Sequence, residues 1–343
     1  MTPVVWGVLG AARIALERVI PAMRQSESCE VRAIASRDSA RAAEAAGSAG
    51  VPVSFGSYED LLADPDIDVV YIPLPNHLHV EWSIRALEAG KHVLCEKPLA
   101  CAADEVQPLV EARDRTGLLV EEAVMVRDHP QWARVRSLLD GGRIGALRNV
   151  QLSYSHFTDD PHDIRNLKDT GGGGLLDVGS YCCAIARLIF DSEPLRAMAL
   201  LDRDPRFGTD RLTTAVLEFP GGHASFFCST QSSRFQMVQM IGTTGWIRAE
   251  VPFAHPPDLP ARLAIGSNIA PGTEPDEVIR FRPVNQYRLQ AERFGRQVRG
   301  AAASRWPLET GVANLRVLDA IRRSGESGRW ESVPVAGTTS GMS

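Results

Sequence analysis

Apolar and polar residues follow two different patterns along this chain, and the change falls near residue 125. In the first third, short apolar runs alternate with stretches in which apolar residues recur at helical spacing. The apolar runs are residues 4–9, 31–35, 68–72, 92–95 and 118–121, and the helical stretches are 14–23, 39–46, 76–89 and 102–116. Strands that alternate with helices of this length imply parallel crossovers. The pattern therefore predicts an α/β fold with a doubly wound parallel sheet.

After residue 125 the chain predicts strands with few helices between them. The expected helices are 131–139, 175–189, 287–299 and 309–324, and the expected strands are 147–157 and a series between 196 and 249. Successive strands without intervening helices indicate an antiparallel sheet. The proline-rich stretch 252–275 is interpreted as a loop.

These patterns divide the chain into three parts. We expect a Rossmann-type dinucleotide-binding domain at residues 1–124. An α+β domain with a mainly antiparallel open sheet follows at residues 125–330, and residues 331–343 form a flexible tail rich in glycine, serine and threonine. No repeat of 20–50 residues appears.

Composition and charge narrow the class of protein. The 343 residues are 44% hydrophobic and 23% charged, as in soluble globular proteins. The 37 basic and 42 acidic residues leave a net charge of −5, which argues against nucleic-acid binding because phosphate contacts need a basic excess. No apolar run approaches the roughly 18 residues of a membrane span, and the opening segment lacks the charged leader of a signal peptide.

The six cysteines are scattered along the chain without a C-x-x-C pair. In a chain of this length they are interpreted as buried small apolar residues rather than as a disulfide framework. The expected compartment is therefore reduced and cytoplasmic.

A degraded glycine motif follows the first predicted strand. In the pattern G-x-G-x-x-G the three key positions are Gly10, Ala12 and Ala15. Glycine still permits the tight turn, and alanine is small enough for the backbone to approach a pyrophosphate at the helix N-terminus. We expect the turn to bind a dinucleotide through Gly10, Ala11, Ala12, Arg13 and Ile14, whereas a purely structural turn is the alternative.

The end of the second predicted strand decides the choice of dinucleotide. An acid there would bind a ribose 2′-hydroxyl, but the sequence has Ser36 and Arg37, and Arg41 follows one helical turn later. A hydroxyl and a guanidinium suit the 2′-phosphate of NADP. NAD remains the alternative if Arg37 is only a solvated surface residue and Asp38 serves as the acid.

Two further segments carry candidate catalytic residues. Lys97, in the sequence Glu96-Lys97-Pro98, follows a predicted parallel strand at the edge where ligands bind in such sheets. A glycine run at 171–174 opens a helix on which Asp177 and Tyr181 are four residues apart and share a face, with Gly179 between them leaving room for a ligand. Each segment alone also has a structural interpretation, as a strand exit and as a helix start with an N-terminal acid.

Taken together, four segments resemble the Gfo/Idh/MocA family, named after glucose-fructose oxidoreductase and inositol dehydrogenase. The segments are GVLGAARIA, PLPNHLHVEW, Glu-Lys-Pro at 96–98 and GGGGLLDVGSY. The resemblance runs from residue 4 to about residue 325. It implies an N-terminal Rossmann domain and a C-terminal α/β domain whose open antiparallel sheet often forms an oligomer interface, and hence a homo-oligomer such as a dimer or tetramer.

The resemblance also implies residue roles. Lys97 would be the catalytic lysine, and Asp177 matches the family's acid. Tyr181 stands where many members have histidine, which is similar to the glucose-fructose oxidoreductase, dihydrodiol dehydrogenase, NADP-dependent D-xylose dehydrogenase and sugar-ketoreductase branches. Those branches largely use NADP, in agreement with Arg37, and the tyrosine argues against an inositol dehydrogenase.

By the same resemblance, further residues are expected near the ligands. Those at the cofactor are Pro73, Leu74, Pro75, Asn76, His79 and Glu96, beside Lys97 itself. Arg165 would hold substrate hydroxyls or a phosphate, whereas Arg127 and His129 contact the substrate or brace the domain junction. Phe157 either stacks on a sugar ring or belongs to the core. No histidine spacing predicts a metal site.

These residues predict an NADP-dependent oxidoreductase that acts on CH–OH groups of a sugar, a sugar derivative or a cyclic diol. Hydride passes between the substrate carbon and the nicotinamide, and Tyr181 handles the proton with Lys97 stabilising its phenolate. Asp177 orients one of the two. The alternative is a catalytically silent, cofactor-binding regulator of the same fold, but the presence of both Lys97 and Tyr181 favours an enzyme.

Overall fold

The structure, a computed structural model, describes residues 2–267 and 274–334, and the chain divides into two compact units. The first unit comprises Met1–Met125 and Asn285–Val312, and the second comprises Val126–Val284 and Ala313–Ser343. The chain leaves the first unit next to the predicted change of pattern at residue 125. It later returns to that unit, which the pattern along the chain did not indicate.

The returning segment carries α8 (Gln286–Val298). Its Ala291 and Phe294 belong to the apolar cluster that also contains Trp6, and the rings of Phe294 and Trp6 lie 6.0 Å apart. This helix is therefore part of the core of the first unit.

Among the described residues, the first unit contains a six-stranded parallel sheet with the order β3-β2-β1-β4-β5-β6. The strands are β1 (Val4–Leu9), β2 (Cys29–Ala35), β3 (Val53–Phe55), β4 (Val69–Ile72), β5 (His92–Cys95) and β6 (Val120–Glu122). This order confirms the predicted doubly wound sheet, and it reverses between β1 and β4, where such sheets bind ligands. The sequence patterns missed β3 and the following α3 (Tyr58–Ala63) because both elements are short.

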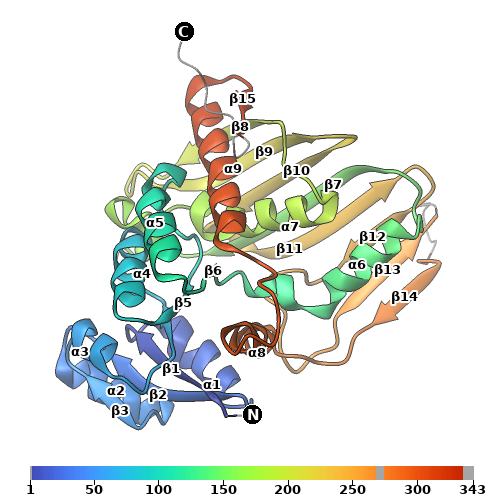
Figure 1. Ribbon diagram of the computed structural model, residues 1–343. Helices are drawn as coiled ribbons and strands as arrows, with labels where there is room; N and C mark the ends of the chain where they lie inside the picture. The colour runs from blue at the N-terminus through green and yellow to red at the C-terminus, as the bar shows by residue number, and fades with distance from the viewer. Residues whose placement is uncertain (1, 268–273, 335–343) are drawn as a thin grey trace. The chain divides into compact units, whose positions relative to one another are not determined.

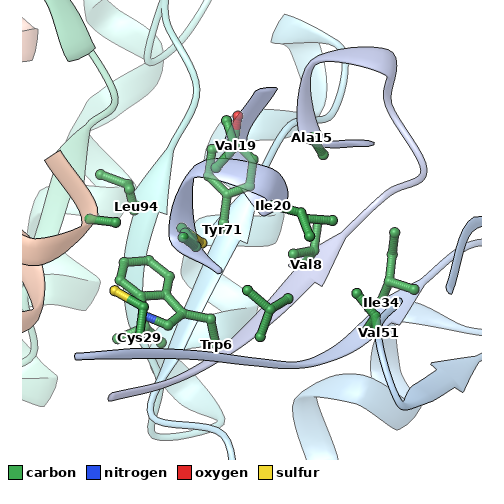
Figure 2. Packing of buried hydrophobic residues seen from close by; sticks show 14 of the residues in the cluster. Trp6, Val8, Ala15, Val19, Ile20, Cys29, Ile34, Val51, Tyr71 and Leu94 are labelled. Atoms are coloured by element: carbon green, nitrogen blue, oxygen red, sulfur yellow. The ribbon is translucent and has the colours of Figure 1, made fainter. Parts of the chain in front are cut away.

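Helices of the first unit pack against this sheet. They are η1 (Ala15–Val19), which continues into α1 (Ile20–Met23), and α2 (Ser39–Ala49) and α4 (His79–Glu88), whereas α5 (Gln107–Thr116) packs against α4. In Figure 2, Val19 and Ile20 of the first helix lie over Trp6, Val8 and Tyr71 of the sheet. Trp6 and Val8 are alternate residues of β1, so they lie on the same face of the strand, and both are buried there.

Within the described residues, the second unit contains a nine-stranded sheet with the order β14-β13-β12-β11-β7-β10-β9-β8-β15. The strands are β7 (Leu147–Phe157), β8 (Arg196–Arg203), β9 (Asp210–Phe219), β10 (Gly222–Ser229), β11 (Gln231–Gly242), β12 (Trp246–Ala249), β13 (Arg262–Gly266), β14 (Glu277–Arg280) and β15 (Glu331–Ser332). Neighbouring strands are antiparallel except β7 and β10, which run parallel. The predicted mainly antiparallel sheet is therefore confirmed.

Two stretches of the second unit differ from the sequence prediction. The predicted loop at 252–275 contains β13, which pairs with β12 and β14. The predicted tail at 331–343 begins with β15, which pairs with β8. Residues 335–343 of that tail lie outside the described residues.

The helices of this unit include α6 (Pro130–Asp140), η7 (Leu175–Gly179), which continues into α7 (Ser180–Phe190), and the part of α9 (Leu308–Ser327) from Ala313 onward. Figure 1 shows α7 lying across one face of the nine-stranded sheet. The stretch Lys168–Phe190 is long and apolar enough to cross a membrane by length and composition, although the sequence predicts no apolar run of that length. Most of this stretch is buried, because α7 packs against β7 and β10 as a core helix.

Candidate active site

The turn after β1 has the geometry of a phosphate-binding turn. Gly10 has a φ of +116°, and a Cβ there would lie 2.9 Å from the Leu74 side chain. Its N–H donates to the carbonyl oxygen of Ala35 on β2. The helix begins directly afterwards, and Leu16 donates the first helical hydrogen bond to Ala12. Helical N–H groups that precede this bond are available for an anion, so the turn fits a dinucleotide pyrophosphate.

The residues after β2 form a cationic cluster. Asp38 caps α2 by accepting from the Arg41 N–H at 3.0 Å. The Arg41 side chain reaches back to within 3.5 Å of the carbonyl oxygen of Ala11 in the phosphate turn. Burial raises the pKa of Tyr58, at the start of α3, and the charges of Arg37 and Arg41 oppose that rise. Two guanidinium groups beside one phenol fit the 2′-phosphate of NADP.

Lys97 lies in the turn that follows β5, at the carboxyl edge of the parallel sheet. The preceding Glu96 accepts hydrogen bonds from the Tyr71 hydroxyl at 2.7 Å and from the Lys97 N–H at 3.1 Å. Burial raises the pKa of Glu96, and the Lys97 charge opposes that rise. Glu96 therefore connects β4 to the lysine turn.

His79 connects two turns of the first unit. Its Nδ1 lies 2.7 Å from the carbonyl oxygen of Pro98, and its Nε2 lies 2.7 Å from that of Leu74. The ring is completely buried, and burial lowers the pKa of His79 to about 4. These contacts join the turn 73–76 to the lysine turn through the His79 ring. The expected role of His79 at the cofactor stays a prediction.

In the second unit, two positions of the glycine run at 171–174 accept only glycine. A Cβ at Gly172 would lie 2.6 Å from the carbonyl oxygen of Arg165. Gly173 has a φ of +118°, and a Cβ there would lie 2.1 Å from Oδ1 of Asp210. Only glycine fits this backbone, which passes directly over the start of β9.

Asp210 fixes the start of the helix that carries Asp177 and Tyr181. Its Oδ2 accepts from the Leu175 N–H at 2.6 Å and from the Thr213 hydroxyl at 3.0 Å. The carboxyl group is buried, and burial raises the pKa of Asp210 to about 6. The acid satisfies a helical N–H that has no partner within the helix.

Asp177 is the centre of a hydrogen-bonded group. Its Oδ2 accepts from Nε2 of His156 at 2.9 Å and from Nε of Arg165 at 2.7 Å. Nη1 of Arg165 also donates to Asp163 at 3.2 Å. The strand β7, the loop after it and the helix thus converge on one carboxylate, which brings Arg165 and Asp177 together. Their roles in catalysis and substrate binding stay predictions.

Tyr181 lies in an aromatic cluster one helical turn after Asp177. Its ring is 5.7 Å from that of Tyr154 and 6.2 Å from that of Phe253, and the latter two rings are stacked at 4.9 Å. Burial, followed by the charge of Asp177, raises the pKa of Tyr154. The charge of Asp177 therefore acts on the Tyr154 phenol, and the Tyr154 ring packs against that of Tyr181.

Gly179 does not leave room for a ligand, which corrects the sequence interpretation. It is buried, and a Cβ there would lie 2.9 Å from Sγ of Cys228 on β10. The glycine allows the helix to approach the sheet, because this side of the helix faces β10.

Three candidate substrate residues lie outside the group around Asp177. Phe157 is 63% exposed and follows His156 in β7, so the two side chains point to opposite faces. Arg127 and His129 are buried, and the His129 ring packs 5.3 Å from that of His255. Their substrate contacts stay predictions. In the described part of the chain, no three His, Cys, Asp or Glu side chains are arranged to hold a metal ion.

Sequence reasoning missed several residues of these groups: Tyr58, Tyr71, Tyr154, His156 and Asp210. A signal existed for the two on β7. Residues 154 and 156 alternate in a predicted strand that is followed by the polar loop leading to the glycine run, so one face of that strand carries a phenol and an imidazole. The other three gain their partners only through tertiary contacts.

Comparisons with known proteins agree with this fold. A family model described as "Oxidoreductase family, NAD-binding Rossmann fold" matches residues 4–123, and the model of the GFO/IDH/MocA C-terminal domain matches residues 132–248. An uncharacterized oxidoreductase of Rhizobium meliloti is 47% identical over 96% of this chain and 98% of its own length. A D-xylose 1-dehydrogenase (NADP(+)) of Haloferax volcanii is 38% identical over 94% and 98%. The crystal structure of a 3-ketoreductase from Actinomadura kijaniata with NADP and TDP-benzene has a TM-score of 0.86 at 31% identity, covering 94% of this chain and 98% of that one.

Proposed function

Because the chain belongs to the Gfo/Idh/MocA oxidoreductase family, we propose that it catalyses NADP(H)-dependent oxidation or reduction of a sugar, sugar derivative or cyclic diol. The observation that carries the proposal is the position of Lys97 at the carboxyl edge of a sheet with Rossmann strand order. Tyr181, on the helix fixed by Asp210, would supply the second catalytic group.

The first unit would hold the cofactor. The Gly10 turn would bind the pyrophosphate, and Ser36, Arg37 and Arg41 would bind the 2′-phosphate, supported by Tyr58. NADP rather than NAD follows from the two guanidinium groups, since Asp38 already caps α2.

When bound, the nicotinamide supplies or accepts the hydride. During reduction, the Tyr181 phenol donates its proton to the substrate carbonyl oxygen, which becomes a hydroxyl. During oxidation, the phenolate takes that proton back. A phenolate forms near neutral pH only beside a cation, and we assign that cation to the Lys97 ammonium. Asp177 is assigned as a positioning residue because its carboxylate holds His156 and Arg165.

The relatives support the substrate class and the two catalytic residues. One acts by name on D-xylose and another is a 3-ketoreductase. That reductase has been crystallised as a variant with one lysine replaced by alanine and as another with one tyrosine replaced by phenylalanine. The two replaced residues are as far apart along its chain as Lys97 and Tyr181 are here.

The test replaces each proposed catalytic group. Lys97→Ala and Tyr181→Phe should each lower kcat at least about 100-fold, because general acid–base catalysis of this kind contributes 10² or more. NADPH oxidation and NADP reduction would be followed with D-xylose, D-glucose and D-fructose, and NADPH affinity by fluorescence titration. The affinity should stay within about threefold of the parent, and Tyr287→Phe on α8 serves as the control.

Near-parental kcat in both variants would end the proposal. NADPH binding with no turnover of any panel sugar would instead favour the second candidate, a catalytically silent regulator of the same fold.

We also propose a homo-oligomer, a dimer or tetramer, in the cytoplasm. Exposed apolar side chains on β8, β9 and β11, namely Leu200, Leu212 and Phe235, support an interface on the second sheet. A reduced compartment is supported by five buried cysteines and by the lack of a disulfide among the described residues. Light scattering coupled to size exclusion measures the oligomeric state.

A further inference from the structure

We propose that His156 and Arg165 form a recognition site for two neighbouring hydroxyl groups of a neutral sugar or diol. The site rests on the proposed function, since it names the substrate groups that the same active site would bind. It assigns a substrate contact to a histidine of β7, and it assigns Arg165 to hydroxyl groups rather than to a phosphate.

His156 presents a hydrogen-bond acceptor. Its Nε2 lies 2.9 Å from Oδ2 of Asp177. An ionised carboxylate only accepts hydrogen bonds, so Nε2 is the ring nitrogen that carries the proton in this contact. The imidazole tautomer with its proton on Nε2 has its lone pair on Nδ1. Among the described residues Nδ1 has no hydrogen-bond partner, and the side chain is 27% exposed. The ring is therefore oriented to accept a hydrogen bond from a ligand hydroxyl.

Arg165 presents a donor beside that acceptor. Its Nε donates to the same Oδ2 of Asp177 at 2.7 Å, and its Nη1 donates to Asp163. Within the described ranges Nη2 has no partner, and the side chain is 32% exposed. One carboxylate thus holds an acceptor and a donor side by side. Two neighbouring hydroxyls complement this pair, since one donates to His156 Nδ1 and the other accepts from Arg165 Nη2.

The pair lies beside Tyr181. Tyr154 precedes His156 by two residues and shares its face of β7, and the Tyr154 ring is 5.7 Å from that of Tyr181. Asp177, which contacts His156, lies one turn before Tyr181 on the helix. Two contacts between the same strand and helix therefore place His156 and Arg165 next to Tyr181, the proposed proton donor.

The charge of the group selects neutral substrates. Arg165 carries one positive charge, and its two partners Asp163 and Asp177 each carry one negative charge. Arg234 is exposed on β11, and its charge also acts on Tyr154. Together, Arg165, Arg234, Asp163 and Asp177 have no net charge. A phosphate or carboxylate substrate needs a positive excess, so the pair binds hydroxyl groups instead.

The test compares substrates and variants in one cycle. The substrates are D-glucose, its singly deoxygenated analogues and D-glucose 6-phosphate, with NADP. The variants are His156→Phe, which removes the acceptor, His156→Gln, which restores one, and Arg165→Leu. The matched control is His162→Phe, which alters an exposed histidine of the following loop.

The parent enzyme should lose about 10- to 100-fold in kcat/KM when one of two neighbouring hydroxyls is removed. His156→Phe should show a similar loss with D-glucose and no further loss with the matching deoxy analogue, and His156→Gln should restore part of the discrimination. A merely structural role would lower kcat/KM equally for every analogue. The KM for NADP should not change in any of these variants.

Equal losses for all analogues, or an unchanged His156→Phe variant, would overturn the site. Preference for D-glucose 6-phosphate, removed by Arg234→Leu, would overturn it in favour of an anion site. If the parent turns over no sugar, saturation-transfer NMR on the NADPH-bound protein measures the binding of the same sugars. If binding then depends on the two hydroxyl groups, the recognition site is supported although the proposed activity is wrong. If no sugar binds, both the recognition site and the proposed activity are wrong.

Discussion

The acids of the proposed site differ in what their carboxylates already bind. Glu96 accepts from Tyr71 and from the backbone of its own turn, whereas Asp177 is shared between His156 and Arg165. The motifs identify Glu96 and Asp177 from the sequence. Apart from the Lys97 N–H, the partners named here come from other strands and loops, so local spacing does not reveal these hydrogen bonds.

Asp210 gives a prediction at this scale. Burial raises its pKa to about 6 in the folded protein, against about 3.9 in an unfolded chain. Between these values the folded state binds the extra proton, so stability falls as pH rises from about 4 to 6. The difference corresponds to about 3 kcal/mol at roughly 1.4 kcal/mol per pKa unit.

Asp210→Asn should remove this dependence. Thermal unfolding of both proteins from pH 4 to pH 7 measures it, because all other carboxyl groups are common to the pair. The stability of the parent relative to the variant should decline across that window, and parallel curves would contradict the assignment.

Among the structural elements, the glycine loop and the helix after it decide where Asp177 and Tyr181 lie. The sequence predicted the helix, but not that Gly173 lies over Asp210 or that Gly179 lies against β10. Short elements escaped prediction for a related reason. The strand β13 is recognisable only through its pairing with β12 and β14, since proline-rich flanks hide its five residues.

Gly173→Ala should destabilise the protein by about 3 kcal/mol, because it combines a positive φ with a Cβ 2.1 Å from the Asp210 carboxylate. Gly221→Ala is the control, since Gly221 also has a positive φ but open space around it. We expect a loss of only about 1 kcal/mol there. Urea denaturation measures both, and equal losses would mean that the contact with Asp210 has no effect.

At the scale of the whole molecule, the return of the chain to the first unit joins residues 285–312 to residues 1–125. The segment Asn285–Val312 packs with the first unit, and α8 forms a buried ion pair with β6. Nη1 of Arg293 lies 2.9 Å from Oε2 of Glu121, and Nη2 pairs with the other carboxylate oxygen. Both side chains are almost completely buried.

Arg293→Met should cost roughly 3–5 kcal/mol, because it removes the guanidinium that faces the buried Glu121 charge. The double variant Glu121→Leu/Arg293→Met should recover most of that loss, since an apolar pair of similar size replaces the ion pair. Chemical unfolding of the single and double variants forms a cycle. An additive double variant would show that the two groups do not interact.

The sequence by itself determined the order of elements, the doubly wound sheet, the dinucleotide turn and the identities of Lys97, Asp177 and Tyr181. Each of these follows from local periodicity or from a short motif, and local physics acts over a few residues. Only the tertiary structure decided that His156 shares Asp177 with Arg165, that Asp210 holds the helix start, and that α8 completes the first unit. These contacts join residues far apart in the chain, and their energy arises from burial and hydrogen bonds that exist only once the strands and helices have packed.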